Sequence, residues 1–186
     1  MLQKEVDERW ALSIGRLHPV KGFAELIEAW ADTRPEGWKL AIVGPDENGY
    51  RKKLASLITK HQLSDCVVLF DEVDEAGKWA LMDSCELYIA PSKSENFGMA
   101  IAEALQSGLP VITTTGTPWS EIIENRCGWW VEPDLDELKY AISEATAMNY
   151  KTLKGMGSHG RRLIAAKYSW EHVAIKTVEL YKSAIS

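Results

Sequence analysis

The sequence predicts an α/β fold in which helices cover both faces of a parallel β-sheet. Short apolar segments alternate with longer amphipathic segments, and this alternation is typical of repeated βα units. Most of the short segments are continuously apolar, as strands that are buried on both faces must be. With 186 residues, 46% of them hydrophobic, the chain is long enough to bury such a core as one domain spanning residues 1–186.

The strands are expected at the short segments, most of which are continuously apolar runs. These segments occupy residues 10–14, 40–43, 67–70, 87–90 and 111–114, and a short further strand is expected at 129–131. Amphipathic segments connect consecutive runs, so neighbouring strands should be parallel and joined by crossover helices.

The helices are expected between and after these strands. Phe23, Ile27 and Trp30 recur at helical spacing, Asp74 precedes a helix that it can cap, and Gly108 ends another. The expected helices are 23–31, 50–61, 75–84, 100–107 and 121–124, followed without intervening strands by 135–148, 150–168 and 170–183. The last three are extra C-terminal helices beyond the alternating pattern.

Composition argues against several classes of function. The net charge of -6 and the pI near 5.3 disfavour nucleic acid as a partner. No apolar run reaches the roughly 20 residues that span a bilayer. The isolated residues Cys66, Cys85 and Cys127 are typical of reduced thiols, which predicts a cytoplasmic protein. No cluster of His and carboxylate residues is present, so neither a metal nor a cofactor is expected.

The loop after the first strand carries two cations. Ligands of open parallel sheets bind at the carboxyl ends of the strands, and Gly15, Arg16 and Lys21 lie at such an end. An arginine and a lysine together suit a diphosphate. The alternative is that both are solvated surface charges between turn glycines. No dinucleotide or P-loop glycine motif is present.

The next two loops carry weaker signals. Gly44 follows the second strand, where a glycine lets a ligand approach the backbone closely. Residues 71–73 follow the third strand and could present backbone groups to a nucleobase. The alternative is an ordinary turn that leads to the helix cap at Asp74.

The loop after the fourth strand is the most informative. Glu95 precedes a helix that opens with Phe97, Gly98 and Met99, where free amides can meet an anion or a hydroxyl. A carboxylate such as Glu95 accepts hydrogen bonds from sugar hydroxyls. Glu103 follows among apolar neighbours and is either an exposed helix residue or a second ligand-binding carboxylate, since acidic residues are rarely buried without a partner.

Taken in order, these motifs resemble the donor-binding, C-terminal half of a retaining glycosyltransferase of family 4. The resemblance is carried by Gly15-Arg16, Lys21-Gly22, Pro91-Ser92, Glu95 and Glu103 enclosing Phe97-Gly98, and by residues 108–111, 118–123 and 169–171. It implies a Rossmann-like sheet that forms one half of a two-domain GT-B fold. Asp71-Glu72 and Thr115-Gly116-Thr117 depart from the family pattern, where glycines are common.

The resemblance also implies the roles of individual residues. Arg16 and Lys21 would neutralise the donor diphosphate as it leaves, and Glu95 would contact hydroxyls of the transferred sugar; these three are the expected catalytic residues. Glu103 would hold the nucleotide ribose. Further donor contacts are expected at Gly15, Gly44, Phe97, Gly98 and Met99.

The function that the resemblance implies is transfer of a hexosyl-type sugar from a UDP-, GDP- or ADP-sugar in glycan biosynthesis, with retention of configuration. It requires an N-terminal acceptor domain that these residues do not contain, so the isolated chain should bind donor and be inactive in transfer. Peripheral membrane association would come only through that other domain. Two alternatives stay open: a non-catalytic nucleotide-sugar-binding module, and a GT-B relative that acts as an epimerase or phosphorylase.

Overall fold

The computed structural model describes residues 8–168 together with Ala174, Val178, Tyr181 and Lys182. The helix expected over 170–183, including its start after Ser169, lies largely outside the described residues. No helix within the described part of the chain is long and apolar enough to cross a membrane.

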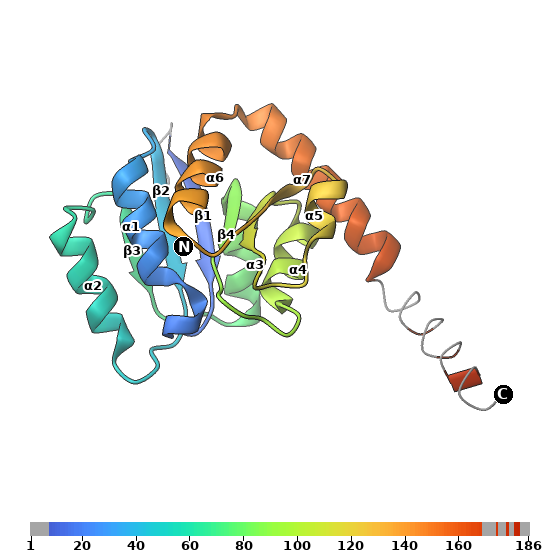
Figure 1. The fold of residues 1–186 in the computed structure, drawn as a ribbon, viewed down its shortest axis with the longest axis horizontal. Helices are drawn as coiled ribbons and strands as arrows, with labels where there is room; N and C mark the ends of the chain where they lie inside the picture. The colour runs from blue at the N-terminus through green and yellow to red at the C-terminus, as the bar shows by residue number, and fades with distance from the viewer. Residues whose placement is uncertain (1–7, 169–173, 175–177, 179–180, 183–186) are drawn as a thin grey trace.

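The centre of the molecule is a six-stranded, fully parallel sheet (Figure 1). Its strands are β1 (Arg9–Ile14), β2 (Trp38–Val43), β3 (Val67–Phe70), β4 (Leu87–Ala90), β5 (Val111–Thr114) and β6 (Gly128–Val131). They lie in the order β3-β2-β1-β4-β5-β6. The first three strands are added toward one edge of the sheet and the last three toward the other, so the strand order switches between β1 and β4. The predicted parallel α/β fold is confirmed.

Helices cover both faces of this sheet (Figure 1). One face packs against α1 (Phe23–Thr33), α2 (Tyr50–Lys60) and α6 (Leu135–Ala147). The other packs against α3 (Glu75–Ser84), α4 (Met99–Ser107) and α5 (Glu121–Glu124). The long helix α7 (Tyr150–Lys167) contributes Leu153 to the first core and Leu163 to the second.

The strand residues divide between the two cores by simple alternation. Leu40 and Ile42 of β2 belong to the core under α1, whereas Ala41 and Val43 belong to the core under α4. Side chains of a strand point to opposite faces in turn, so a continuously apolar strand serves two helix layers at once.

The first two strands are longer than the apolar runs predicted. β1 begins at Arg9 and β2 at Trp38, and these two residues pair directly in the parallel ladder. The Arg9 guanidinium lies 4.1 Å from the centre of the buried Trp38 ring, a cation–π contact that joins a charged residue to the sheet. The contact with Trp38 and the ion pair with Glu86 allow Arg9 to be partly buried at the start of β1.

The ends of the central helices follow the predicted caps. The Asp74 carboxylate accepts a hydrogen bond from the Gly77 amide at the start of α3. Gly108 adopts φ +82° and ends α4 in the left-handed conformation that favours glycine. These two helices cover the same face of the sheet.

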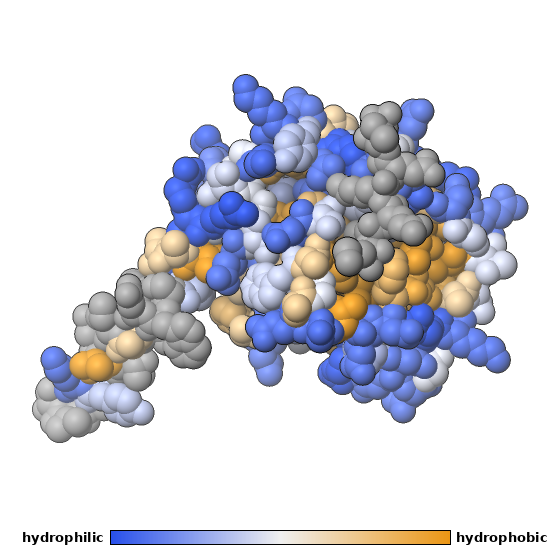
Figure 2. Space-filling model, turned by 180° about the vertical axis from the view of Figure 1, so that it is seen from behind, coloured by the Kyte–Doolittle hydropathy of each residue, from blue (hydrophilic) through white to orange (hydrophobic). Residues whose placement is uncertain are grey.

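Hydrophobic side chains also remain accessible at the surface. Figure 2 shows them gathered on part of the face that is turned away in Figure 1. In the edge strand β3, Val68 and Phe70 are only partly buried. An edge strand has a neighbour on one side only, which explains the weaker burial.

Candidate functional site

A crevice opens where β1 and β4 diverge. The two strands pair only at Ala11 with Leu87 and Leu12 with Tyr88, whereas β1 pairs with β2 along its whole length. Beyond Leu12 and Tyr88, hydrogen bonds from side chains connect the two strands in place of the backbone ladder. The Ser13 hydroxyl donates to the Ile89 carbonyl at 2.5 Å. Divergence at the point where strand order reverses places a ligand crevice at the carboxyl edge.

Tyr88 stabilises the open end of β1 from across this gap. Its hydroxyl donates to the Ile14 carbonyl at 3.2 Å and lies 3.4 Å from the Ile14 amide. Burial raises the pKa of this phenol above its ordinary value, and the charges of Glu103 and Glu95 act in the same direction. Tyr88 is therefore a neutral residue in the lining of the crevice.

The crevice contains a pocket of about 270 Å³. Its lining is drawn from the ends of β1 and β4 and the start of α4: Ser13, Ile14, Gly15, Arg16, Lys21, Phe23, Tyr88, Ala90, Pro91, Ser92, Glu95, Gly98, Met99, Ala100 and Ile101. Of the predicted site residues, Gly15, Arg16, Lys21, Glu95, Gly98 and Met99 are in this lining. Gly44, Phe97 and Glu103 are not.

Glu95 is held from two sides through one oxygen. Its Oε1 lies 2.5 Å from Lys21 Nζ and accepts a hydrogen bond from Ser92 Oγ at 2.9 Å. The Lys21 and Glu95 side chains are only 20% and 18% exposed. Among the described residues Oε2 of Glu95 has no hydrogen-bond partner. The carboxylate is thus oriented by protein and retains one acceptor oxygen at the pocket.

Lys21 reaches this position through a short turn that sequence reasoning treated as loop. Residues Pro19–Lys21 form a 3₁₀ helix whose first amides are capped by His18 Nδ1, which accepts from the Val20 amide. Gly22 follows at φ +71°, where a Cβ would lie 2.0 Å from the Pro91 carbonyl oxygen. Only glycine allows this contact between the loops after β1 and β4, which brings Lys21 beside Glu95.

Arg16 lies at the rim of the pocket. Its guanidinium forms an ion pair with Glu47 at 2.6 Å, and its side chain is 61% exposed. Arg16 and Lys21 therefore line one pocket, but each is paired with a different carboxylate. Their cationic charge is already balanced within the protein, so an anionic ligand must compete with Glu47 at the exposed rim.

The loop before α4 is fixed by aromatic packing. The Trp119 indole N–H donates to the Phe97 carbonyl at 2.5 Å, and the rings of Phe97, Trp119 and Tyr168 have their centres 5.2 to 5.6 Å apart. The carbonyl and the ring of Phe97 are thus both engaged by other residues of the protein, although the side chain is partly exposed. Gly98 at φ +81° then starts α4 and turns the backbone of Met99 toward the pocket lining.

Glu103 lies one helical turn beyond Met99 on the same face of α4. Its Oε1 accepts from Lys78 Nζ of α3 at 2.5 Å, and the two side chains are 19% and 22% exposed. The sequence left open whether Glu103 is exposed or binds a ligand. In the structure its side chain is largely buried and has Lys78 as a partner within the protein. The predicted ribose contact of Glu103 stays a prediction.

Gly44 has a structural reason to be glycine. A Cβ at this residue would lie 2.0 Å from the Gly15 carbonyl oxygen, because the loops after β1 and β2 run side by side in close contact. The donor contact expected of Gly44 stays a prediction, and the close approach seen here is to the protein's own backbone.

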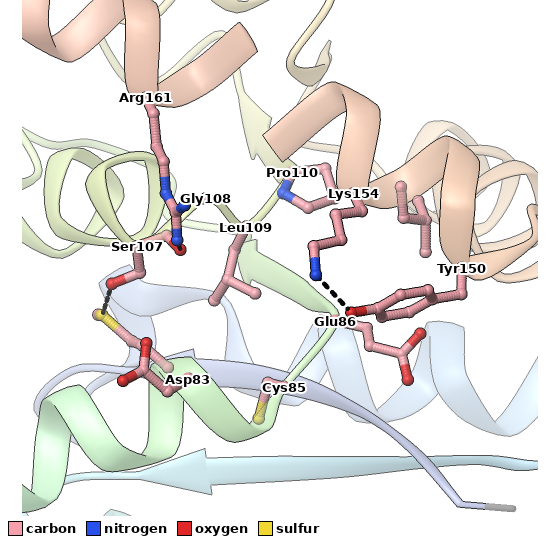
Figure 3. Close-up of a pocket in the computed structure, with 12 residues that line it drawn as sticks. Asp83, Cys85, Glu86, Ser107, Gly108, Leu109, Pro110, Tyr150, Lys154 and Arg161 are labelled. Atoms are coloured by element: carbon pink, nitrogen blue, oxygen red, sulfur yellow. Dashed lines mark hydrogen bonds between the residues drawn. The ribbon is translucent and has the colours of Figure 1, made fainter. Parts of the chain in front are cut away.

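A smaller pocket of about 140 Å³ lies at the opposite, amino-terminal edge of the strands (Figure 3). Arg161 lies on one wall and donates to the Ser107 carbonyl at 2.5 Å, and Lys154 donates to the Tyr150 hydroxyl at 2.9 Å. Glu86 on the other wall is paired with Arg9. The Arg161 contact joins α7 to the end of α4. This position is not where ligands of parallel sheets bind.

Four residues were not among the site residues predicted from the sequence: Ser92 and Tyr88, which line the pocket, and Lys78 and Trp119, which bind Glu103 and the Phe97 carbonyl. Ser92 follows a strand and lies three residues before Glu95, which is a readable signal. A tyrosine in a buried strand also needs a partner for its hydroxyl. Lys78 and Trp119 give no local signal, because their partners come from other loops and helices.

Among the described residues no three His, Cys, Asp or Glu side chains gather as metal ligands would.

Comparison with known proteins identifies the family. Residues 2–163 match the family model described as glycosyl transferases group 1. The chain belongs to this family. It is 32% identical over 173 residues to an MMP alpha-(1->4)-mannosyltransferase of Mycolicibacterium hassiacum, covering 90% of this chain and 41% of that protein. It is 26% identical over 179 residues to a GDP-mannose:cellobiosyl-diphosphopolyprenol alpha-mannosyltransferase of Xanthomonas campestris, covering 95% and 46%.

Solved structures agree with this group 1 assignment. A sucrose-phosphate synthase from Thermosynechococcus elongatus superposes with a TM-score of 0.85 at 25% identity, covering 98% of this chain and 47% of that one. HepE of Anabaena, crystallised with UDP and glucose, superposes at 0.82 with 23% identity, covering 95% and 49%, and shows likeness of fold. The predicted GT-B type of fold is confirmed. The chain spans less than half the length of each of these proteins.

Proposed function

We propose that the pocket between β1 and β4 binds the diphosphate and sugar of a nucleotide-sugar donor. The observation that carries this proposal is the oriented Glu95 carboxylate beside Lys21 in a pocket at the switch point of the sheet. A carboxylate with one open acceptor suits a sugar hydroxyl, and an adjacent ammonium suits a diphosphate oxygen. Because Lys21 and Glu95 line the same pocket, one nucleotide-sugar could contact both.

In the proposed mechanism, this chain stabilises the departing diphosphate. Lys21 and Arg16 lie where negative charge grows as the bond between sugar and diphosphate breaks, and fixed cations favour that charge. Glu95 holds the sugar at the same time and so orients the reacting carbon. Gly15, Gly98 and Met99 supply backbone at the lining.

The acceptor is proposed to bind to an N-terminal domain outside this sequence, with transfer of a hexosyl-type sugar and retention of configuration. Support comes from the coverage, since the chain spans less than half of its relatives. In this proposal residues 1–186 form one donor-binding domain that is inactive alone, because positioning of two substrates and exclusion of water need both halves. The free thiols Cys66, Cys85 and Cys127 support a cytoplasmic location.

The donor is proposed to be a UDP-, GDP- or ADP-sugar. HepE was solved with UDP and glucose, and the Xanthomonas relative is named for GDP-mannose, so both nucleotide classes occur among similar proteins. No feature of the described pocket favours one nucleobase.

Isothermal titration calorimetry of this chain with UDP, GDP and ADP tests the binding proposal, with Lys21→Ala as the site variant. We expect one nucleotide to bind and the variant to weaken it about 10-fold or more, as loss of a charge-assisted contact does. An absence of binding for all three nucleotides contradicts the proposal. For the complete protein, NMR of the newly formed anomeric centre tests retention, and an inverted product contradicts it.

A further inference from the structure

The two predicted ligand carboxylates share one arrangement. Lys21 and Ser92 hold Oε1 of Glu95, and Lys78 holds Oε1 of Glu103 at 2.5 Å. In both cases Oε2 has no hydrogen-bond partner among the residues that the structure describes. Each glutamate is therefore an oriented acceptor with one oxygen open, and in each a lysine does the orienting.

The Lys78–Glu103 pair is built between two helices. Lys78 comes from α3 and Glu103 from α4, and both side chains are about four-fifths buried. Lys78 Nζ also lies 5.3 Å from the centre of the neighbouring Trp79 ring, a second contact that restricts the lysine. A restricted, half-buried pair keeps one geometry better than an exposed pair does.

The pair lies toward the donor pocket. Met99, one turn before Glu103 on the same helix, lines the pocket. Burial raises the pKa of the Tyr88 phenol, which lines the pocket, and the charges of Glu103 and Glu95 raise it further. Glu103 therefore lies one helical turn from the pocket lining, on the side of α4 that Met99 occupies.

We propose that Lys78 is a positioning residue for ribose recognition, which holds Glu103 so that its open oxygen accepts from a ribose hydroxyl of the nucleotide. This inference rests on the proposed function. Lys78 takes one carboxylate oxygen, fixes the rotamer of Glu103 and balances its charge near the donor diphosphate. Without Lys78, Glu103 is free to rotate and presents an unbalanced negative charge to the ligand.

The test compares ribose with deoxyribose in the same nucleotide. Calorimetry measures Kd for the nucleoside diphosphate that binds this chain and for its 2′-deoxy and 3′-deoxy forms. The parent chain should prefer the ribose form over at least one deoxy form by about 10-fold or more, as expected for a hydrogen bond to a charged acceptor. Lys78→Met should reduce that ratio to about 3-fold or less, chiefly by weakening the ribose form. Lys78→Arg should restore it.

Controls separate orientation from general effects. Lys151→Met removes one exposed lysine on α7, and it should leave the ratio unchanged. A loss of folding or of overall positive charge in Lys78→Met would weaken the ribose and deoxyribose forms alike and leave the ratio at the parent value. Thermal unfolding of each variant confirms that a folded protein is titrated.

The outcomes distinguish the two proposals. If no nucleoside diphosphate binds the parent, the proposed function fails and this inference fails with it. If the parent binds but does not distinguish ribose from either deoxyribose, the ribose contact of Glu103 is wrong, and the inference fails while diphosphate binding stands. If the parent distinguishes them and Lys78→Met keeps the full ratio, only the inference fails.

Discussion

Lys21 Nζ lies 2.5 Å from Glu95 Oε1, so the cation expected at a diphosphate and the carboxylate expected at a sugar form one ion pair. Both side chains are about four-fifths buried, which makes the pair stronger and less screened than an exposed pair. A substitution that removes the charge of Lys21 or Glu95 leaves the other residue without its partner in this ion pair. Substitutions at these two residues must therefore be interpreted together.

Glu95→Gln should separate sugar binding from diphosphate binding. The amide cannot accept hydrogen bonds as strongly as the carboxylate, so the affinity for a nucleotide-sugar should fall by about 10-fold. The affinity for the free nucleoside diphosphate should be unchanged or higher, because Lys21 loses its anionic partner. Calorimetry with both ligands measures the difference.

The matched control is Glu36→Gln, which removes an exposed carboxylate near the amino-terminal edge of the sheet. It should change neither affinity. A Glu95→Gln variant that loses both ligands to the same degree would contradict the assignment of Glu95 to the sugar.

Glu47→Gln should strengthen nucleoside diphosphate binding by about two- to five-fold, because it frees the Arg16 guanidinium from an exposed ion pair. Arg16→Ala should weaken binding. The gain in Glu47→Gln should shrink as salt is added, since both the released pair and the new contact are exposed to screening. Titrations at low and high salt measure this. If Glu47→Gln strengthens binding equally in an Arg16→Ala background, Arg16 is not the residue responsible.

Two glycines of α7 should respond in opposite ways to alanine. A Cβ at Gly155 meets no atom within 4 Å, so Gly155→Ala should raise the free energy of unfolding by about 0.5–1 kcal/mol through better helix propensity. A Cβ at Gly157 would lie 1.7 Å from the Gly108 carbonyl oxygen, so Gly157→Ala should lower it by about 1–3 kcal/mol. Urea denaturation measures both. Equal effects at the two glycines would show that α7 does not pack on Gly108 in this way.

Stability should fall in alkaline solution through Cys127. Burial raises the pKa of this thiol from its ordinary value of 9.0 to about 11, with the charge of Glu121 adding to the effect. Between pH 9 and 11 the unfolded thiol is ionised while the folded thiol keeps its proton. The stabilisation is therefore complete below pH 9 and is lost as pH rises through 11.

The measurement is urea denaturation at pH 8 and pH 10.5, compared with Cys127→Ala. The alanine variant lacks the thiol, so its free energy of unfolding should fall less over this range than that of the parent. Other titrating groups, including Cys66 and Tyr168, are common to both proteins and cancel in the comparison. Identical pH dependence of the two proteins would contradict the raised pKa of Cys127.

Local pattern was sufficient for most of the fold. The predicted bounds of β3, β4 and β5 are the observed ones. All residues of β4 are buried, as in a strand that helices cover on both faces, whereas β3 is a partly buried edge strand and β5 ends in two threonines. The caps at Asp74 and Gly108 could also be predicted from the sequence, because a helix end depends on a few adjacent residues. The extension of β1 to Arg9 was not readable, because its burial depends on the distant Trp38 ring.

The sequence predicted which residues lie near the site but not which side chains pair with one another. Lys21 and Glu95 follow strands that end at one edge, so their presence near a ligand crevice could be expected from the chain alone. The pairings of Arg16 with Glu47 and of Glu103 with Lys78 came from packing in three dimensions. A charged side chain looks the same in sequence whether it faces a ligand, solvent or another charge. Coulombic attraction depends on distance in space, and loops and helices far apart in the chain set that distance.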